Sequence, residues 1–167
     1  LANWECKYVS IILELQIKYL KNNALFTTRI KKAMEKIKFV SDYQINSSKK
    51  IIYPYLSTAS GLSQWFADDV VINEDKVYNF IYDGEDHYAR AVIMRTNHHV
   101  KFEFFDPGEE EEGVDAEHSF IEFKLDENEL TQTIYLRVIE YGDAFDEQEQ
   151  QSIWEGLIGS LKEIIGG

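Results

Sequence analysis

Four histidines are the side chains in this 167-residue chain that most directly suggest chemistry, since imidazole binds metals and exchanges protons near neutral pH. His98 and His99 are adjacent, so on a strand they project to opposite faces and do not easily share one ion. His87 and His118 have no helix-spaced partner and no cysteine nearby, unlike the ligands of zinc sites. We therefore predict no metal site, and we interpret the histidines as solvated residues of hairpins.

Acidic side chains are the second candidates for chemistry. The run Glu109–Glu112 lacks the alternating oxygen ligands of a calcium loop, so a solvated loop is expected there. The pairs Asp68/Asp69 and Glu85/Asp86 fall in predicted turns, where contact with water keeps the pKa values of carboxylates ordinary. Neither the run of glutamates nor the carboxylate pairs indicate a catalytic site.

Nucleophile and cofactor motifs are missing from the sequence. It contains no Gly-x-Ser-x-Gly elbow and no glycine-rich phosphate loop. The single cysteine, Cys6, precludes an internal disulfide, which fits a reducing compartment such as the cytoplasm. We expect no cofactor and no catalytic residue of a known motif.

Charge excludes several classes of partner. The net charge of −13 repels phosphate backbones and anionic membrane surfaces, so neither nucleic acid nor membrane is an expected partner. The charge is uneven, because residues 1–33 carry +4 and the remaining residues carry −17. This jump, together with a first methionine at Met34, predicts a dispensable and helical N-terminal extension over 1–33 and a domain over 34–167. The apolar stretch from Tyr8 to Leu20 is interrupted by polar residues and is too short to span a membrane.

Alternation of apolar and polar residues predicts a first strand over 35–45. Helix N-caps at 46–48 predict a short helix over 49–56, which Pro54 should kink or shorten. Ser60 is the expected cap of a second short helix over 61–67. Turn residues then separate six strand candidates, which predict an antiparallel meander: 69–72, 76–82, 87–95, 99–105, 119–125 and 130–141.

A long helix is expected at the end of the chain. Asp146 and Glu149 are spaced as a capping box, and Gly166 suits the C-terminal end. An apolar stripe at helical spacing includes Trp154, Leu157 and Leu161. Because helix and sheet each have one apolar face, burial of one against the other is expected. The alternation places Ile134, Leu136 and Val138 inward, opposite that stripe, and Thr133, Tyr135 and Arg137 outward.

This order of elements resembles the helix-grip fold of the START-like superfamily, also called SRPBCC. The run 61–68 looks like the Leu-x-x-Trp-Phe run of members related to the Hsp90-activating co-chaperone, and 154–162 is similar to their last helix. The resemblance implies an α+β domain with a curved seven-stranded antiparallel sheet, two short helices and a long C-terminal helix. The superfamily includes lipid carriers, cyclases and protein-binding members, so the resemblance leaves function open.

The resemblance implies a cavity between the sheet and the last helix. Our leading hypothesis is a cytoplasmic, non-enzymatic domain that binds a small hydrophobic or lipid-like molecule there. The residues expected to line this cavity are Trp65, Phe66, Phe80, Phe102, Phe123, Ile134, Leu136, Val138, Trp154, Leu157, Ile158 and Leu161. The alternatives are a module that binds a protein client in the manner of the Hsp90 activator, or a cyclase- or hydrolase-like enzyme using Arg90, Arg95 and Tyr135. The sequence does not set the oligomeric state.

Overall fold

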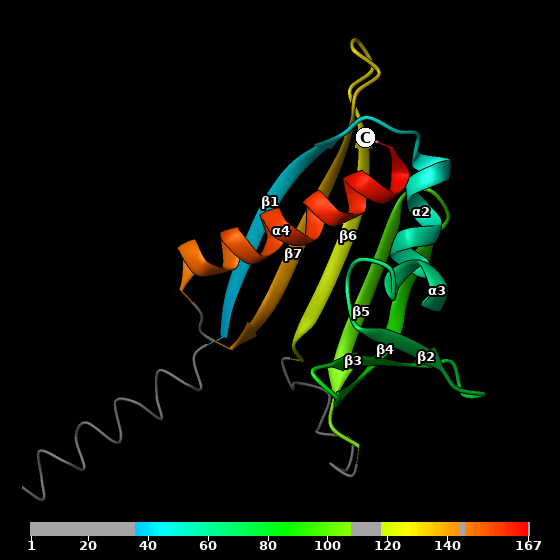
Figure 1. Cartoon of the computed structure of the whole chain (residues 1–167), viewed down its shortest axis with the longest axis vertical. Coiled ribbons are helices and arrows are strands. Elements are labelled where there is room, and N and C mark those ends of the chain that lie inside the picture. Colours follow the sequence, from blue (N-terminus) through cyan, green and yellow to red (C-terminus); the bar gives the residue numbers. More distant parts are fainter. Residues whose placement is uncertain (1–35, 108–117, 144–145, 167) are drawn as a thin grey trace, which may run out of the picture. The chain divides into compact units, whose positions relative to one another are not determined.

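The computed structural model describes residues 36–107, 118–143 and 146–166. Seven strands form one sheet, in the spatial order β1-β7-β6-β5-β4-β3-β2, and three helices accompany them. The elements are β1 (Lys36–Ile45), α2 (Lys49–Ser57), α3 (Ala59–Leu62), β2 (Asp69–Ile72), β3 (Val77–Tyr82), β4 (Glu85–Arg95), β5 (His99–Phe105), β6 (Phe120–Glu127), β7 (Ile134–Asp143) and α4 (Glu147–Ile165). The helix-grip fold is thereby confirmed (Figure 1).

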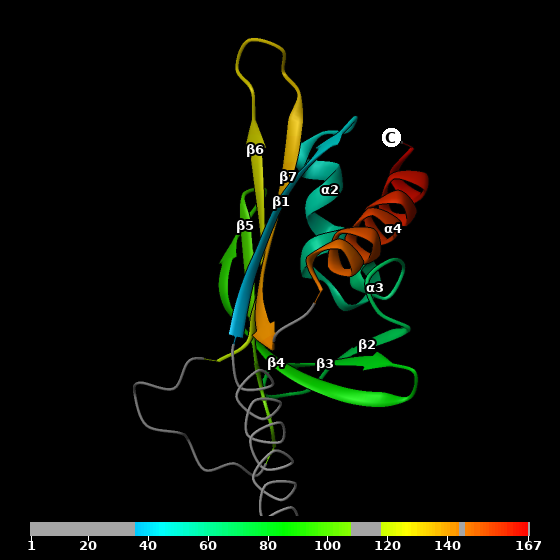
Figure 2. The same ribbon diagram turned by 90° about the vertical axis from the view of Figure 1, so that its left-hand side faces the viewer.

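Each strand from β2 to β7 pairs antiparallel with the next along the chain, as the meander predicts. The β3–β4 connection has Asp83 at φ 50° and Gly84 at φ 81°, which matches the expected Asp-Gly hairpin turn. A register shift between Ala91 and Ile93 interrupts the β4–β5 ladder. Such a bulge bends a strand, and the sheet curves toward the helices at its β2–β4 end (Figure 2).

The long helix α4 crosses one face of the sheet, and its ends follow the sequence signals (Figure 1). Asp146 accepts hydrogen bonds from the backbone N–H of Gln148 and Glu149, both at 3.0 Å. Gly166 ends the helix at φ 76°, a left-handed conformation that glycine adopts without strain. The capping box and the C-terminal glycine are therefore both confirmed. No helix among the described residues is long and apolar enough to cross a membrane.

Several element boundaries differ from the prediction, most clearly those of α3 and β7. Thr58, not Ser60, caps the second short helix, because the Thr58 hydroxyl accepts from Gly61 N–H at 3.0 Å. The helix therefore begins at Ala59. It ends at Leu62, and the chain turns where we expected the helix to continue to Ala67. The last strand starts at Ile134 because Asn128 accepts from two backbone N–H groups and holds 128–133 as a turn.

The predicted orientation of the last strand is confirmed. Ile134, Leu136 and Val138 are buried on the face that α4 covers, with at most 5% of their surface exposed. Arg137 lies on the opposite face, beside Asp42 of β1. The face of the sheet that points away from α4 is called the outer face below.

Candidate functional site

A layer of aromatic rings fills the space between α4 and the sheet. This aromatic layer consists of Trp65, Phe66, Phe80, Phe123 and Trp154, all buried. Phe66 is central, because its ring stacks on that of Trp154 at 5.9 Å and meets Phe80 and Phe123 edge-on at 5.6 and 5.8 Å. Trp65 and Phe66 come from the turn after α3, which lies beside the end of the sheet (Figure 2). Packed aromatic pairs of this kind add stability beyond their buried area.

The structure gathers all twelve predicted cavity residues in one cluster. Eleven of them are buried, and Leu157 is partly buried at the margin. They come from the α3–β2 turn, from four strands and from α4, so chain segments far apart in sequence meet there. The hypothesis that this cluster receives a ligand stays a prediction.

Polar groups attach the first half of α4 to β7. The indole N–H of Trp154 donates to Glu140 Oε2 at 2.7 Å, and the side-chain amide of Gln150 donates to the same oxygen. Burial, with the nearby charges of Glu140 and Asp68, raises the pKa of Tyr82 above its ordinary value. Glu140 thus holds the indole against the aromatic layer. No motif in the sequence marked Glu140, because its partners Gln150 and Trp154 lie on the next element, α4.

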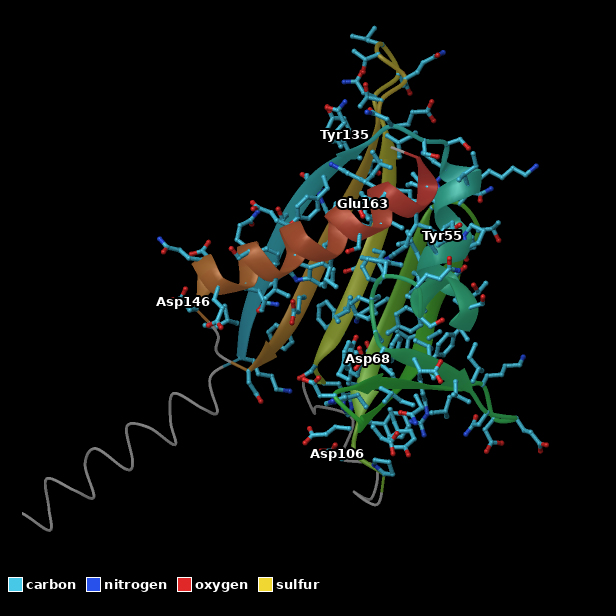
Figure 3. The ribbon with its side chains drawn as sticks, viewed as in Figure 1. Tyr55, Asp68, Asp106, Tyr135, Asp146 and Glu163 are labelled. Carbon is cyan, nitrogen blue, oxygen red and sulfur yellow. The ribbon has the colours of Figure 1, made fainter. Side chains whose placement is uncertain are left out.

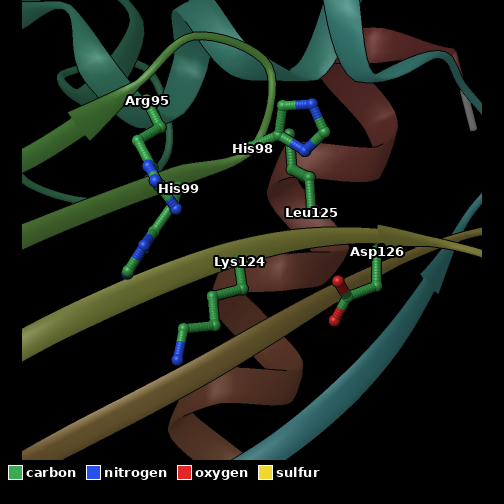
Figure 4. A pocket seen from close by; sticks show the side chains of 6 residues that line it. All are labelled: Arg95, His98, His99, Lys124, Leu125 and Asp126. Carbon is green, nitrogen blue, oxygen red and sulfur yellow. The ribbon is translucent and has the colours of Figure 1, made fainter.

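The outer face holds a second site, a hollow of about 390 Å³ (Figure 4). We call it the outer hollow. It is lined by Arg95, His98, His99, Lys124, Leu125 and Asp126. Neither its position nor its mainly charged lining was predicted.

His99 corrects our interpretation of the histidines as solvated. Its side chain is only 15% exposed, and its Nε2 lies 2.6 Å from Glu122 Oε1. Lys124 donates to the same oxygen at 2.9 Å. Burial alone would raise the pKa of Glu122, but the hydrogen bonds from Lys124 and His99 outweigh it and lower that pKa. The other histidines, His87, His98 and His118, are exposed as predicted.

The remaining candidates are spread over the molecule. Arg90 lies over the Phe105 ring at 4.4 Å, Arg95 lines the outer hollow, and Tyr135 lies toward the β6–β7 turn (Figure 3). The structure therefore does not bring the three proposed enzymatic residues together. Among the described residues, no three His, Cys, Asp or Glu side chains converge as metal ligands would.

The carboxylate pairs differ in part from the prediction. Glu85 and Asp86 belong to β4 rather than a turn, and Asp86 accepts from the Asn79 amide at 2.8 Å. Asp68 does lie in a turn, where it accepts from the backbone N–H of Asp83. Cys6 and the run 109–112 lie outside the described residues.

A family model for the START-like superfamily domain matches residues 33–167. The chain belongs to the START-like superfamily. The match agrees with the resemblance carried by the run 61–68 and by the last helix. Comparison with curated proteins finds no match.

Solved structures share the fold of this START-like domain. The Aha1 dimer from Colwellia psychrerythraea is 17% identical, with a TM-score of 0.59 over 77% of this chain and 96% of that one. A protein from Bacteroides fragilis is 28% identical, with a TM-score of 0.52 over 78% of this chain and 92% of that one. DynU16, from the dynemicin biosynthetic locus, is 10% identical, with a TM-score of 0.59 over 77% of this chain and 47% of that one. These likenesses establish the fold and leave the function open, since one such fold hosts many functions.

Proposed function

We propose that this START-like domain is a non-enzymatic binding module that takes a small hydrophobic molecule between the sheet and α4. The observation that supports the proposal is the aromatic layer. Rings, rather than close backbone contacts, occupy the space under α4, and several of them contact Phe66 at once. The rings fill this region in the structure, so the site would form where they now pack. Its surroundings are apolar with few polar groups at the margin, here Glu140 and Tyr82, as in sites for small apolar ligands.

The ligand would enter by displacing Phe66. This side chain belongs to a turn rather than to a regular element, so its displacement does not require a helix or strand to unfold. Ala67 and Leu157 are only partly buried against the core, which places the margin of the aromatic layer near the surface. Glu140 keeps Trp154 in place while Phe66 moves.

Native mass spectrometry of protein purified from its own host tests the proposal, because a co-purified small molecule would appear as added mass. Calorimetric titration with decanoate, below its micelle concentration, tests it on purified protein. We expect Phe66→Ala to bind decanoate at least about tenfold more tightly than the parent, because its ring no longer competes for the space.

The matched control is Ile139→Ala, which removes a buried side chain on the outer face, away from the aromatic layer. It should leave decanoate affinity unchanged. The proposal is wrong if no added mass is found and neither the parent nor Phe66→Ala binds decanoate. Equal gains in Phe66→Ala and Ile139→Ala would indicate binding to loosened protein rather than to this site.

A protein partner is the second candidate, and the edge strand β2 favours it. β2 ends the sheet, and its Val71 and Ile72 side chains are 50% and 39% exposed. An open edge with apolar side chains can add a strand from another protein. The resemblance of the run 61–68 to members related to the Hsp90-activating co-chaperone makes an Hsp90 chaperone from the same host the first partner to test. Val71→Lys should abolish binding measured by calorimetry, and a parent protein that does not bind the chaperone would refute this candidate.

A further inference from the structure

A row of basic side chains crosses the outer face of the sheet. Arg95 of β4 pairs with His99 of β5, His99 with Lys124 of β6, and Lys124 with Arg137 of β7. Residues directly opposite each other in antiparallel strands project to the same face, with Cβ atoms about 4.5–5.5 Å apart. The four side chains therefore lie next to one another, in a protein whose net charge is −13.

Three of these four side chains already have an acidic partner. Two nitrogens of Arg137 donate to the two oxygens of Asp42, at 2.7 and 2.8 Å. Lys124 and His99 share one oxygen of Glu122. Arg95 differs, because it is exposed and no carboxylate of the described residues lies within 4 Å of its guanidinium. Its charge remains available to a ligand.

The free guanidinium faces the outer hollow. Figure 4 shows Arg95, His99 and Lys124 on one side of the hollow and Asp126 on the other. Leu125 also lines the hollow, although its side chain is almost fully buried. Asp126 follows Lys124 by two residues on the same strand, and its carboxylate therefore projects to the same face. The hollow therefore has positively charged side chains on one side and a carboxylate that accepts hydrogen bonds on the other.

We propose that the outer hollow binds a small phosphorylated molecule, with its phosphate on Arg95 and Lys124 and a hydroxyl group donating to Asp126. A guanidinium pairs bidentately with phosphate oxygens. Lys124 lies two strands away, beyond His99, and adds a second positive charge although it also pairs with Glu122. The volume of about 390 Å³ leaves room for more than the phosphate itself. This site lies on the face of the sheet opposite the aromatic layer, so it is independent of the proposed hydrophobic ligand.

Amide chemical-shift titration of the full chain tests this site with four probes: inorganic phosphate, glucose 6-phosphate, glucose and acetate. We expect saturable shifts at the amides of 95–99 and 124–126 with the two phosphates, at dissociation constants on the order of 1 mM. Glucose 6-phosphate should bind more tightly than inorganic phosphate, because its hydroxyl groups reach Asp126. Glucose and acetate should leave these amides unchanged at the same concentrations.

Two variants assign the contacts. Arg95→Gln should weaken the binding of both phosphates at least about tenfold. Asp126→Asn should remove the advantage of glucose 6-phosphate over inorganic phosphate. The matched control is Arg90→Gln, which removes a cation from the same strand and face but outside the hollow, beside Phe105. It should bind as the parent does.

Three results would overturn the proposal. They are the absence of saturable shifts, shifts that persist unchanged in Arg95→Gln, and acetate binding as tight as that of phosphate. Because Arg95 is exposed, amides remote from the hollow should keep their positions in Arg95→Gln, which verifies that the variant is folded.

Discussion

At the scale of single residues, Trp154 has two roles in one side chain. Its ring packs on Phe66 and Phe123, and its indole N–H donates to Glu140 at the end of β7. Only 2% of its surface is exposed. The packing and the hydrogen bond can be separated by substitution, because phenylalanine retains a ring but no N–H donor.

We expect Trp154→Ala to lower the free energy of unfolding by about 3–5 kcal/mol, the cost of removing a buried aromatic and leaving a cavity. Leu161→Ala, at a fully buried position of the same helix, should cost about 2–5 kcal/mol. Trp154→Phe should cost about 1.5–3 kcal/mol, for the lost hydrogen bond to a charged group. Denaturant titration measures all three.

A mild loss in Trp154→Ala beside a large loss in Leu161→Ala would show that little packing depends on the indole, and that the space beneath it is hollow. No loss at either position would mean that α4 does not pack on the sheet.

Glu122 makes the outer face sensitive to acid. Its pKa is lower in the folded protein than the ordinary value of about 4.3 expected for the unfolded chain. As the pH falls through that value, the unfolded state binds a proton first, so this contribution to stability is present above it and lost below it. We expect Glu122→Gln to reduce the free energy of unfolding by about 1–3 kcal/mol at pH 7 and by much less near pH 3. Urea titrations at both pH values check this, and an equal loss at both would contradict it.

At the scale of elements, the contact between α2 and α3 depends on Gly61. A Cβ atom at this position would lie 2.2 Å from the carbonyl oxygen of Pro54 and 2.6 Å from the Cα of Tyr55, both backbone atoms. The two short helices can therefore approach only because residue 61 has no side chain. Their contact positions the following turn, which carries Trp65 and Phe66 into the aromatic layer.

Gly61→Ala should destabilise the protein by about 1–3 kcal/mol, because the backbone of α2 must shift. The matched control is Gly159→Ala in α4, where an added Cβ meets nothing within 4 Å. That substitution should stabilise the protein by about 0.5–1 kcal/mol through helix propensity. Thermal unfolding of the two variants side by side measures the contrast, and equal effects would refute the steric explanation.

At the scale of the whole molecule, the family match begins at residue 33, and the contacts from Ile37 onward form one compact unit. The division into an extension over 1–33 and a domain over 34–167 stays a prediction. The role of residues 1–33 stays a prediction, since they lie outside the described residues.

We expect a protein lacking residues 1–33 to fold and to unfold cooperatively, with a midpoint within about 10 °C of that of the full chain. Calorimetry of the two proteins provides the measurement. A larger drop would mean that the extension packs on the domain. An untruncated protein with Glu14→Lys, which changes only the charge of the extension, should unfold at the parent's temperature.

The sequence by itself determined the elements and the inward face of the sheet. These features follow from local patterns in the sequence, which residues close together in the chain determine. Examples are the hairpin turn at Asp83-Gly84, the Asp146 cap of α4 and the alternation through Leu136. The start of α3 was missed although it is also local, because Thr58 and Ser60 are both good N-cap residues and only the chain geometry selects between them.

Only the tertiary structure decided which polar groups meet. Arg95, His99, Lys124 and Arg137 are spread over more than forty residues, and no spacing rule relates them. Strand pairing aligns them in one row and places Glu122 between two of them. In the same way, Glu140 meets Trp154 only because α4 folds back across β7. Such contacts depend on register and connection geometry, which are properties of the folded sheet rather than of any short stretch of sequence.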